Sequence, residues 1–84
     1  MFVLLPLKPR IFKLLKKYHL QNKFEKQSKL FLANPKHPSL NLELLEPKQY
    51  GIYSFRLDRK FRALFVFRPD LKTTEILNIT VHYQ

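Results

Sequence analysis

Three kinds of side chain in the C-terminal half of this sequence could carry out acid–base chemistry on a phosphodiester: a carboxylate, guanidinium groups and an imidazole. The residues are Glu43, Arg56, Arg62 and His82. A carboxylate can accept a proton from an attacking hydroxyl, and a histidine with a pKa of about 6.5 can protonate a leaving oxygen. Arginine stabilises charge that grows on a phosphate because its fork of donors matches the phosphate oxygens. This chemistry requires that the fold place these residues on one surface.

Strand periodicity predicts such a surface. The second half of the chain predicts four short strands, near residues 40–46, 51–57, 61–68 and 74–83. Successive side chains of a strand point to opposite faces of the sheet, so each strand divides into two sets. The polar set is Asn41, Glu43, Ser54, Arg56, Lys60, Arg62, Arg68, Asn78, Thr80 and His82. Tyr83 points the other way by strict alternation, and it joins this face only if the chain end bends.

The other set is apolar and predicts the face that packs on the core. Its members are Leu40, Leu42, Leu44, Tyr53, Phe55, Leu57, Phe61, Ala63, Phe65, Phe67, Leu77, Ile79 and Val81. The period of two and the position opposite Arg62 indicate that these aromatic residues form a core rather than a platform for stacking bases.

Two helices should cover the apolar face. The first is predicted to begin near Pro9, and it carries one apolar stripe at helical spacing. That stripe is Ile11, Leu14, Leu15 and Tyr18. For the second helix, Asn22 and Glu25 resemble a capping signal, and Asn34-Pro35 is predicted to end it. Its buried side should be Phe24, Phe31 and Leu32.

A short strand, Phe2 to Leu7, precedes the helices, and Pro6 predicts that it lies at a sheet edge. The predicted fold is therefore α+β: an N-terminal strand, a two-helix hairpin and a four-stranded antiparallel sheet packed on the helices. The 84 residues predict one domain spanning 1–84.

Composition narrows the classes of function. The net charge of +10 predicts a polyanionic partner, which could be RNA, DNA or an acidic protein segment. The absence of cysteine excludes disulfides and a thiolate metal site, and no histidine motif or glycine-rich phosphate loop predicts a cofactor. The apolar start is too short for a signal peptide, and no stretch is long enough to span a membrane. These features predict a soluble cytoplasmic protein.

The polar face also has an interpretation without function. The outer face of an antiparallel sheet is normally polar and solvated, so charged residues there need no chemical role. Arg59 and Lys60 flank Asp58 and fit a charged turn, and His19 and His37 fit surface positions.

The segment HPSLNLELLEPKQYGIYSFRLDRKFRALFVF resembles the RelE/ParE toxin superfamily of type II toxin–antitoxin systems. Its parts are the loop from His37 to Leu40, the strand residues Tyr53 to Arg56, and the strand residues Phe61 to Phe65. The order of one strand, two helices and an antiparallel sheet also fits. Within the superfamily, the terminal pair His82-Tyr83 is most similar to the YoeB-type mRNA interferase branch.

This resemblance implies a role for several residues. Glu43 would be the general base, Arg62 would stabilise the phosphate in the transition state, His82 would be the general acid and Tyr83 would position the substrate. The basic residues expected to bind RNA are Arg56, Arg59, Lys60 and Arg68.

The resemblance also implies an activity and partners. The expected activity is cleavage of mRNA in the ribosomal A site without a metal or other cofactor, and the expected partner is a cognate antitoxin. Two alternatives remain open at this point: a ParE-like toxin that poisons DNA gyrase without nuclease residues, and an inactive module that binds RNA or an antitoxin. Fold alone does not decide among them.

Overall fold

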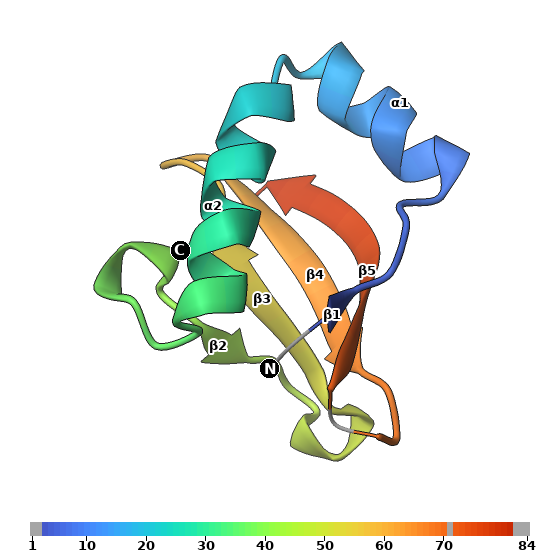
Figure 1. The fold of residues 1–84 in the computed structure, drawn as a ribbon, viewed down its shortest axis with the longest axis vertical. Coiled ribbons are helices and arrows are strands. Elements are labelled where there is room, and N and C mark those ends of the chain that lie inside the picture. Colours follow the sequence, from blue (N-terminus) through green and yellow to red (C-terminus); the bar gives the residue numbers. More distant parts are fainter. Residues whose placement is uncertain (1–2, 71, 82–84) are drawn as a thin grey trace.

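The computed structural model describes residues 3–70 and 72–81, which form two helices that cover one side of a five-stranded sheet (Figure 1). The helices are α1 (Pro9–Lys17) and α2 (Gln21–Ala33). The strands are β1 (Val3–Leu4), β2 (Glu43–Leu44), β3 (Ile52–Arg56), β4 (Phe61–Phe67) and β5 (Thr73–Val81). Short 3-10 turns, η1 (Pro38–Leu40) and η2 (Lys48–Tyr50), flank β2. The predicted α+β class is confirmed.

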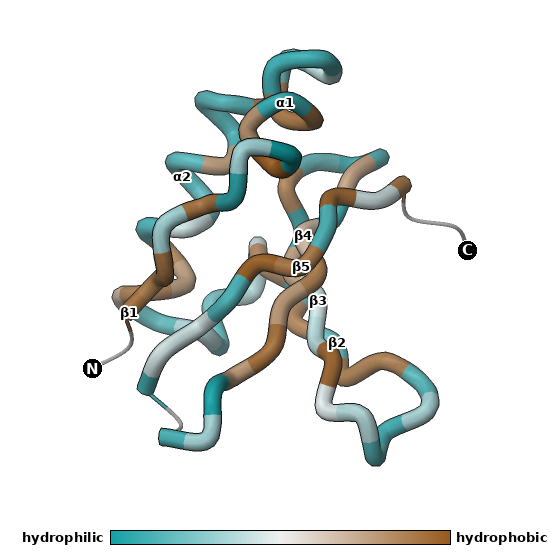
Figure 2. The backbone as a smooth tube through the Cα atoms, turned by 90° about the vertical axis from the view of Figure 1, so that its right-hand side faces the viewer, coloured by the Kyte–Doolittle hydropathy of each residue, from teal (hydrophilic) through white to brown (hydrophobic). Residues whose placement is uncertain are grey.

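The strands are arranged in the order β1-β5-β4-β3-β2. Strands β2 to β5 pair antiparallel, as predicted, while β1 pairs parallel to β5. In the sequence, both helices follow β1 and precede the other strands. They therefore form part of the long connection that the parallel pair of β1 and β5 needs. As predicted, β1 lies at an edge, although it is shorter than the predicted strand from Phe2 to Leu7. Figure 2 shows both helices on one side of the strands.

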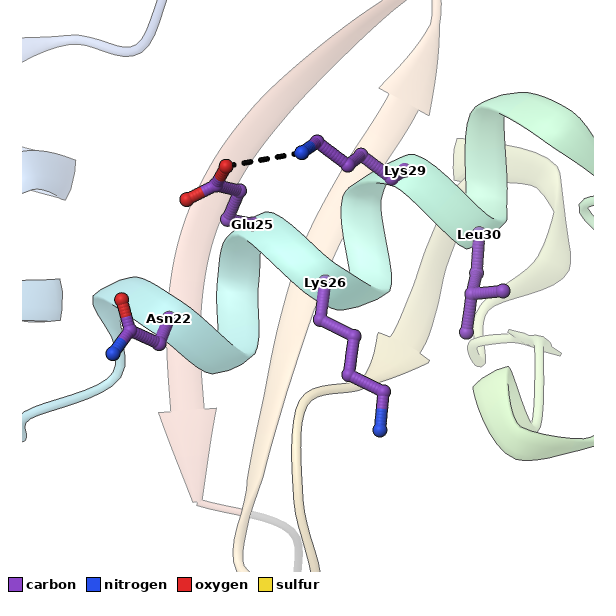
Figure 3. Close-up of a pocket in the computed structure, with 5 residues that line it drawn as sticks. All are labelled: Asn22, Glu25, Lys26, Lys29 and Leu30. Carbon is purple, nitrogen blue, oxygen red and sulfur yellow. Dashed lines mark ion pairs between the residues drawn. The ribbon is translucent and has the colours of Figure 1, made fainter.

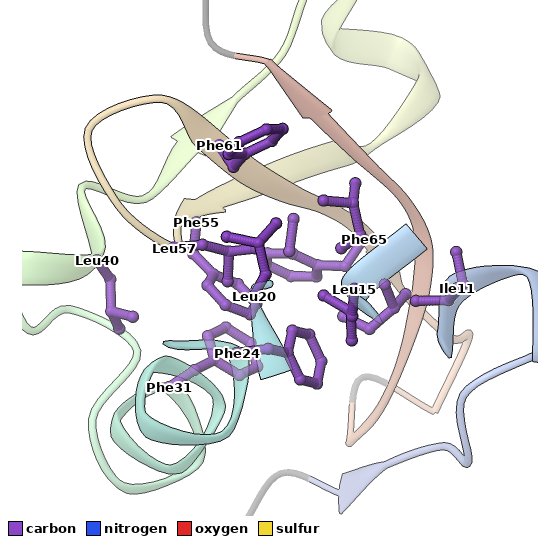
Figure 4. Packing of buried hydrophobic residues seen from close by; sticks show 13 residues of the cluster. Ile11, Leu15, Leu20, Phe24, Phe31, Leu40, Phe55, Leu57, Phe61 and Phe65 are labelled. Atoms are coloured by element: carbon purple, nitrogen blue, oxygen red, sulfur yellow. The ribbon is translucent and has the colours of Figure 1, made fainter. Parts of the chain in front are cut away.

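The core fills the space between the helices and the sheet (Figure 4). At its centre the Phe31 ring of α2 stacks on Phe55 of β3, with centroids 5.3 Å apart, and meets Phe65 of β4 edge-on at 4.9 Å. From α1, Ile11 and Leu15 are buried against this cluster, as the helical stripe predicts.

The capping signal predicted for the second helix is wrong. The helix begins at Gln21 with Leu20 as its N-cap residue, so Asn22 lies inside the first turn and no side chain caps the end. Burial decides this boundary. Leu20 is almost fully buried, and His19, with a φ of 55°, turns the chain sharply so that Leu20 enters the core.

Three details of the predicted strands also differ. Strand β2 has two residues, because Leu40 is buried in the turn η1, and Leu44 is 39% exposed instead of packing on the core. A bulge shifts the pairing of β4 with β5, so Leu64 is paired with Asn78 while Phe65 is paired with Ile76. The extra residue is Leu77, and Ile76 takes the core position that strict alternation assigns to Leu77.

The central position of Phe31 predicts a large loss of stability on truncation. Phe31→Ala should lower the free energy of unfolding by about 3–5 kcal/mol, because it leaves a cavity where three aromatic rings meet. Urea unfolding followed by circular dichroism measures this. Phe12→Ala is the control, since Phe12 is 54% exposed and its loss should change stability by less than about 0.5 kcal/mol. Equal effects of the two changes would contradict this account of the core.

Candidate active site

Arg62 is the most constrained charged residue in the described part of the chain. Its side chain lies on the sheet face away from the helices, yet the residue is only 3% exposed. Its Nε donates to Ser54 Oγ at 2.8 Å, and its Nη2 donates to the carbonyl oxygens of Ser54 and Asn41. Its Nη1 is buried and has no hydrogen-bond partner among residues 3–70 and 72–81. The alternation of β4 therefore places Arg62 on the predicted face, but that face is not open to solvent here.

Burial lowers the pKa of the Arg62 guanidinium from its ordinary value. The nearby Glu43 carboxylate opposes this shift and raises the pKa, while the positive charge of Arg56 lowers it further. Arginine keeps its proton in proteins, so the result is a fixed positive charge in a poorly solvated position. Such a charge interacts strongly with any anion that reaches it.

The register of the sheet brings the other candidate residues to the same face. Glu43 is paired with Ser54, and Arg56 is paired with Arg62. Directly paired residues point to the same side, so Glu43, Ser54, Arg56 and Arg62 form one cluster. Thr80 of β5 is the partner of Arg62 on the other side. The predicted roles of His82 and Tyr83 concern residues outside those that the structure describes.

The other basic residues predicted to bind RNA, Arg59, Lys60 and Arg68, lie at different distances from this cluster. Arg59 is exposed in the turn after β3, and the Lys60 ammonium lies 5.5 Å from the centre of the Phe61 ring. Arg68 follows the opposite end of β4 and donates to Glu75 at 2.8 Å. Arg68 follows Arg62 by six positions of extended chain, a distance of about 20 Å. The structure therefore does not bring Arg68 together with the others.

A second basic feature adjoins the cluster where α2 meets the end of β3. A pocket of about 410 Å³ is lined by Lys23, Lys26, Gln27, Ser39, Arg56, Leu57, Asp58 and Arg59. Gln27 fixes its wall, because its amide nitrogen donates to the carbonyl oxygens of Arg56, at 2.8 Å, and Ser39, at 3.3 Å. We call this feature the α2–β3 pocket.

Asp58 organises the turn beside this pocket. Its Oδ1 accepts from the backbone N–H groups of Lys60 and Phe61, both at 2.8 Å, and its Oδ2 accepts from Lys23 Nζ at 2.8 Å. Burial alone would raise the pKa of this carboxyl, but the Lys23 bond and the two N–H bonds outweigh it and lower the pKa. The carboxylate thus ties α2 to the hairpin of β3 and β4.

A larger hollow of about 580 Å³ lies elsewhere, along the outer side of α2 (Figure 3). Its lining residues Asn22, Glu25, Lys26, Lys29 and Leu30 recur at helical spacing, and Glu25 and Lys29 form an ion pair at 3.1 Å. This is one exposed helix face, and apart from Lys26 it shares no residue with the α2–β3 pocket.

Sequence reasoning missed the residues that support the site. Ser54 was placed on the polar face, but its bond to Arg62 depends on strand pairing that spacing along the chain does not reveal. Gln27 and Ser28 carried a signal, because with Phe24 and Phe31 they complete the spacing i, i+3, i+4, i+7 of one buried helix face.

Two properties of the described residues bear on the class of protein. Across residues 3–70 and 72–81, no group of three or more His, Cys, Asp or Glu side chains is arranged to hold a metal ion. Neither α1 nor α2 has the length and apolar character that crossing a membrane requires.

The fold is similar to that of solved YoeB and YafQ structures, which agrees with the fold that the sequence motifs predict. It is similar to the YoeB–YefM complex from Staphylococcus aureus, with a TM-score of 0.69, 18% identity and 99% of each chain covered. It is also similar to the YoeB/ParE toxin from Agrobacterium tumefaciens (TM-score 0.69, 14% identity, 98% of each chain). YafQ from E. coli strain BL21(DE3) gives a TM-score of 0.70 at 14% identity, with 98% of this chain and 92% of that chain covered. The sequence matches no protein-family model and no curated protein.

The contacts of Arg62 predict strong coupling with Ser54. Ser54→Ala should lower the free energy of unfolding by about 1.5–3 kcal/mol, because it leaves a buried charged donor without its acceptor. In the double variant with Arg62→Met, the loss should be clearly smaller than the sum of the two single losses. Urea unfolding of the four proteins measures this coupling. Additive losses would show that the bond between Arg62 and Ser54 contributes nothing to stability. Ser39→Ala, at an exposed position, serves as the control.

The lowered pKa of Asp58 predicts a pH-dependent contribution to stability. A carboxyl with a depressed pKa in the folded state stabilises the fold above its unfolded pKa, and this contribution is lost as the pH falls through the folded pKa. Wild type should therefore be more stable than Asp58→Asn at pH 7, and the difference should shrink below about pH 4. Urea unfolding across this range measures it. The control Glu25→Gln removes a carboxylate from an exposed pair and should have little effect. A constant difference at every pH would contradict this role.

Proposed function

We propose that this chain is a toxin of a toxin–antitoxin system that cleaves mRNA on the ribosome by acid–base chemistry. The observation that carries the proposal is the Arg62 cluster: a buried guanidinium, held by Ser54 and electrostatically coupled to Glu43, on a fold shared with YoeB. Among the described residues Nη1 of Arg62 has no hydrogen-bond partner, so it is a donor that a phosphate oxygen could accept from.

In this mechanism Glu43 takes the proton from a ribose 2′-hydroxyl. The freed oxygen attacks the adjacent phosphorus, and the bond from phosphorus to the 5′-oxygen breaks. Arg62 stabilises the negative charge that grows on the phosphate, and His82 gives a proton to the leaving 5′-oxygen. The products are a 2′,3′-cyclic phosphate and a 5′-hydroxyl. Tyr83 helps to position the substrate, and Arg56, Arg59 and Lys60 attract the RNA backbone.

The burial of Arg62 sets a condition on this mechanism. At 3% exposure the guanidinium cannot touch a phosphate in the present arrangement. Binding must therefore displace part of what covers the guanidinium, and the segment from Asn41 to Glu43 borders it. The contact between Arg62 Nη2 and the Asn41 carbonyl is the one that a phosphate oxygen would replace.

The proposal includes an antitoxin and a place of action. One similar structure is a heterotetrameric YoeB-YefM toxin-antitoxin complex. We propose that this chain likewise has a protein antitoxin, whose acidic groups would complement the net charge of +10. Action on ribosomes would place the protein in the cytoplasm.

The decisive experiment uses purified ribosomes programmed with a defined mRNA, and primer extension maps the 5′ ends of the fragments. Wild type should cut within the A-site codon. Arg62→Ala should slow cleavage about 10²–10³-fold, and His82→Ala and Glu43→Gln about 10²–10⁴-fold each. Lys13→Gln is the control, since it removes one exposed charge of α1 and should leave the rate within a few-fold of wild type.

Absence of a cut by correctly folded wild type would overturn the proposal. A gyrase assay with the same protein would then test the ParE-like alternative, in which DNA is damaged and mRNA stays intact. Cleavage that survives both Arg62→Ala and His82→Ala would show that the activity resides elsewhere in the chain.

A further inference from the structure

The α2–β3 pocket carries more positive charge than its own acid can balance. Three lining residues on α2 and in the turn after β3, Lys23, Lys26 and Arg59, carry positive charge, and Asp58 is the acid of the described lining. Arg56 contributes its carbonyl group, which accepts from Gln27. The oxygens of Asp58 are already occupied by Lys23 Nζ and two backbone N–H groups. A ligand of this pocket would therefore meet an excess of two positive charges, which favours an anion.

The pocket is also held in shape before any ligand arrives. Gln27 is buried, and its amide bonds join α2 to the carbonyl groups of Ser39 and Arg56. The ion pair between Lys23 and Asp58 joins the same helix to the turn after β3. Because these ties fix the walls, binding would order few groups beyond the ends of Lys26 and Arg59.

Arg56 belongs both to the lining of the pocket and to the Arg62 cluster. It lines the pocket and is the direct partner of Arg62 across β3 and β4, a separation of about 4.5–5.5 Å between Cα atoms. A chain of regularly spaced phosphates could contact both places once the cover over Arg62 is displaced. An acidic peptide also carries negative charge, but the proposed ligand of Arg62 is an RNA phosphate, so the anion expected beside it is the next phosphate of the same chain.

We propose that the α2–β3 pocket is a second phosphate-binding subsite, which holds the RNA backbone beside the phosphate at Arg62. This inference rests on the proposed function, because it takes the ligand of Arg62 to be an RNA phosphate. Lys26 and Arg59 are its principal ligand-binding residues, since Lys23 is engaged by Asp58.

The test measures binding without cleavage. The probe is a short single-stranded oligonucleotide with 2′-O-methyl groups at every ribose, which blocks attack by the 2′-oxygen, and fluorescence anisotropy gives the Kd. The variant Lys26→Gln/Arg59→Gln is compared with Lys13→Gln/Lys16→Gln. Both remove two exposed positive charges, so their effects on net charge are equal, but only the first pair lines the pocket.

The pocket variant should bind at least tenfold more weakly, and the control pair should bind within about threefold of wild type. In the pocket variant alone, the slope of log K against log salt should also fall by about 0.7 for each phosphate that the protein no longer neutralises. Thermal unfolding establishes that both variants are folded. Equal weakening by the two pairs would overturn the subsite, because the effect would then be one of net charge.

Two further measurements separate this inference from its competitors. In the first, poly-glutamate competes with the probe for wild type. If it displaces the probe as effectively as unlabelled oligonucleotide does, the phosphate subsite is overturned and the pocket is a surface for an acidic protein. The ribosome assay is run in parallel. If wild type cuts no mRNA while the pocket variant alone loses affinity, the nuclease proposal fails and the phosphate subsite stands. If wild type cuts and both pairs bind alike, the subsite alone fails.

Discussion

The burial of one guanidinium constrains much of the sheet's outer face. A charge removed from water must be compensated by hydrogen bonds, or the fold loses several kcal/mol. For Arg62 the compensation comes from the Ser54 hydroxyl and from two carbonyl oxygens, one of them Asn41 in the loop before β2. Because Asn41 takes part, the loop is tied to the sheet, and Glu43 follows two residues later within electrostatic reach. The candidate chemistry and the local architecture therefore depend on the same contacts.

Helix α2 serves the core and the basic surface at the same time. Phe24 and Phe31 face the sheet, where the Phe31 ring packs between two strands. On the same buried face Gln27 reaches the end of β3, and Lys23 at the margin pairs with Asp58. A helix that is locked by its aromatic side chains can present cations in fixed positions. This arrangement explains how a chain with so many lysines can form a defined pocket rather than a diffuse positive surface.

The YoeB and YafQ structures share this fold although they are only 14–18% identical to this chain in sequence. In this chain the apolar residues of β3 and β4 and the apolar stripes of the two helices form the core between the two layers. Many sequences satisfy such patterns, since a core tolerates exchanges of apolar residues that keep its volume. The particular residues around Arg62 are a separate matter, because chemistry depends on the site and not on the fold.

Local patterns along the chain were enough to predict the α+β class, the two helices, the paired strands and the face on which Glu43, Arg56 and Arg62 meet. These follow from periods of 3.6 and 2, which are properties of neighbouring residues. Folding in three dimensions was needed to establish that Leu20 precedes α2 as its N-cap, that a bulge puts Ile76 in the place of Leu77, and that Arg62 is buried. Each of these depends on contacts between residues far apart in the chain. The α2–β3 pocket is of the same kind, since its cations come from a helix and a turn about thirty residues apart.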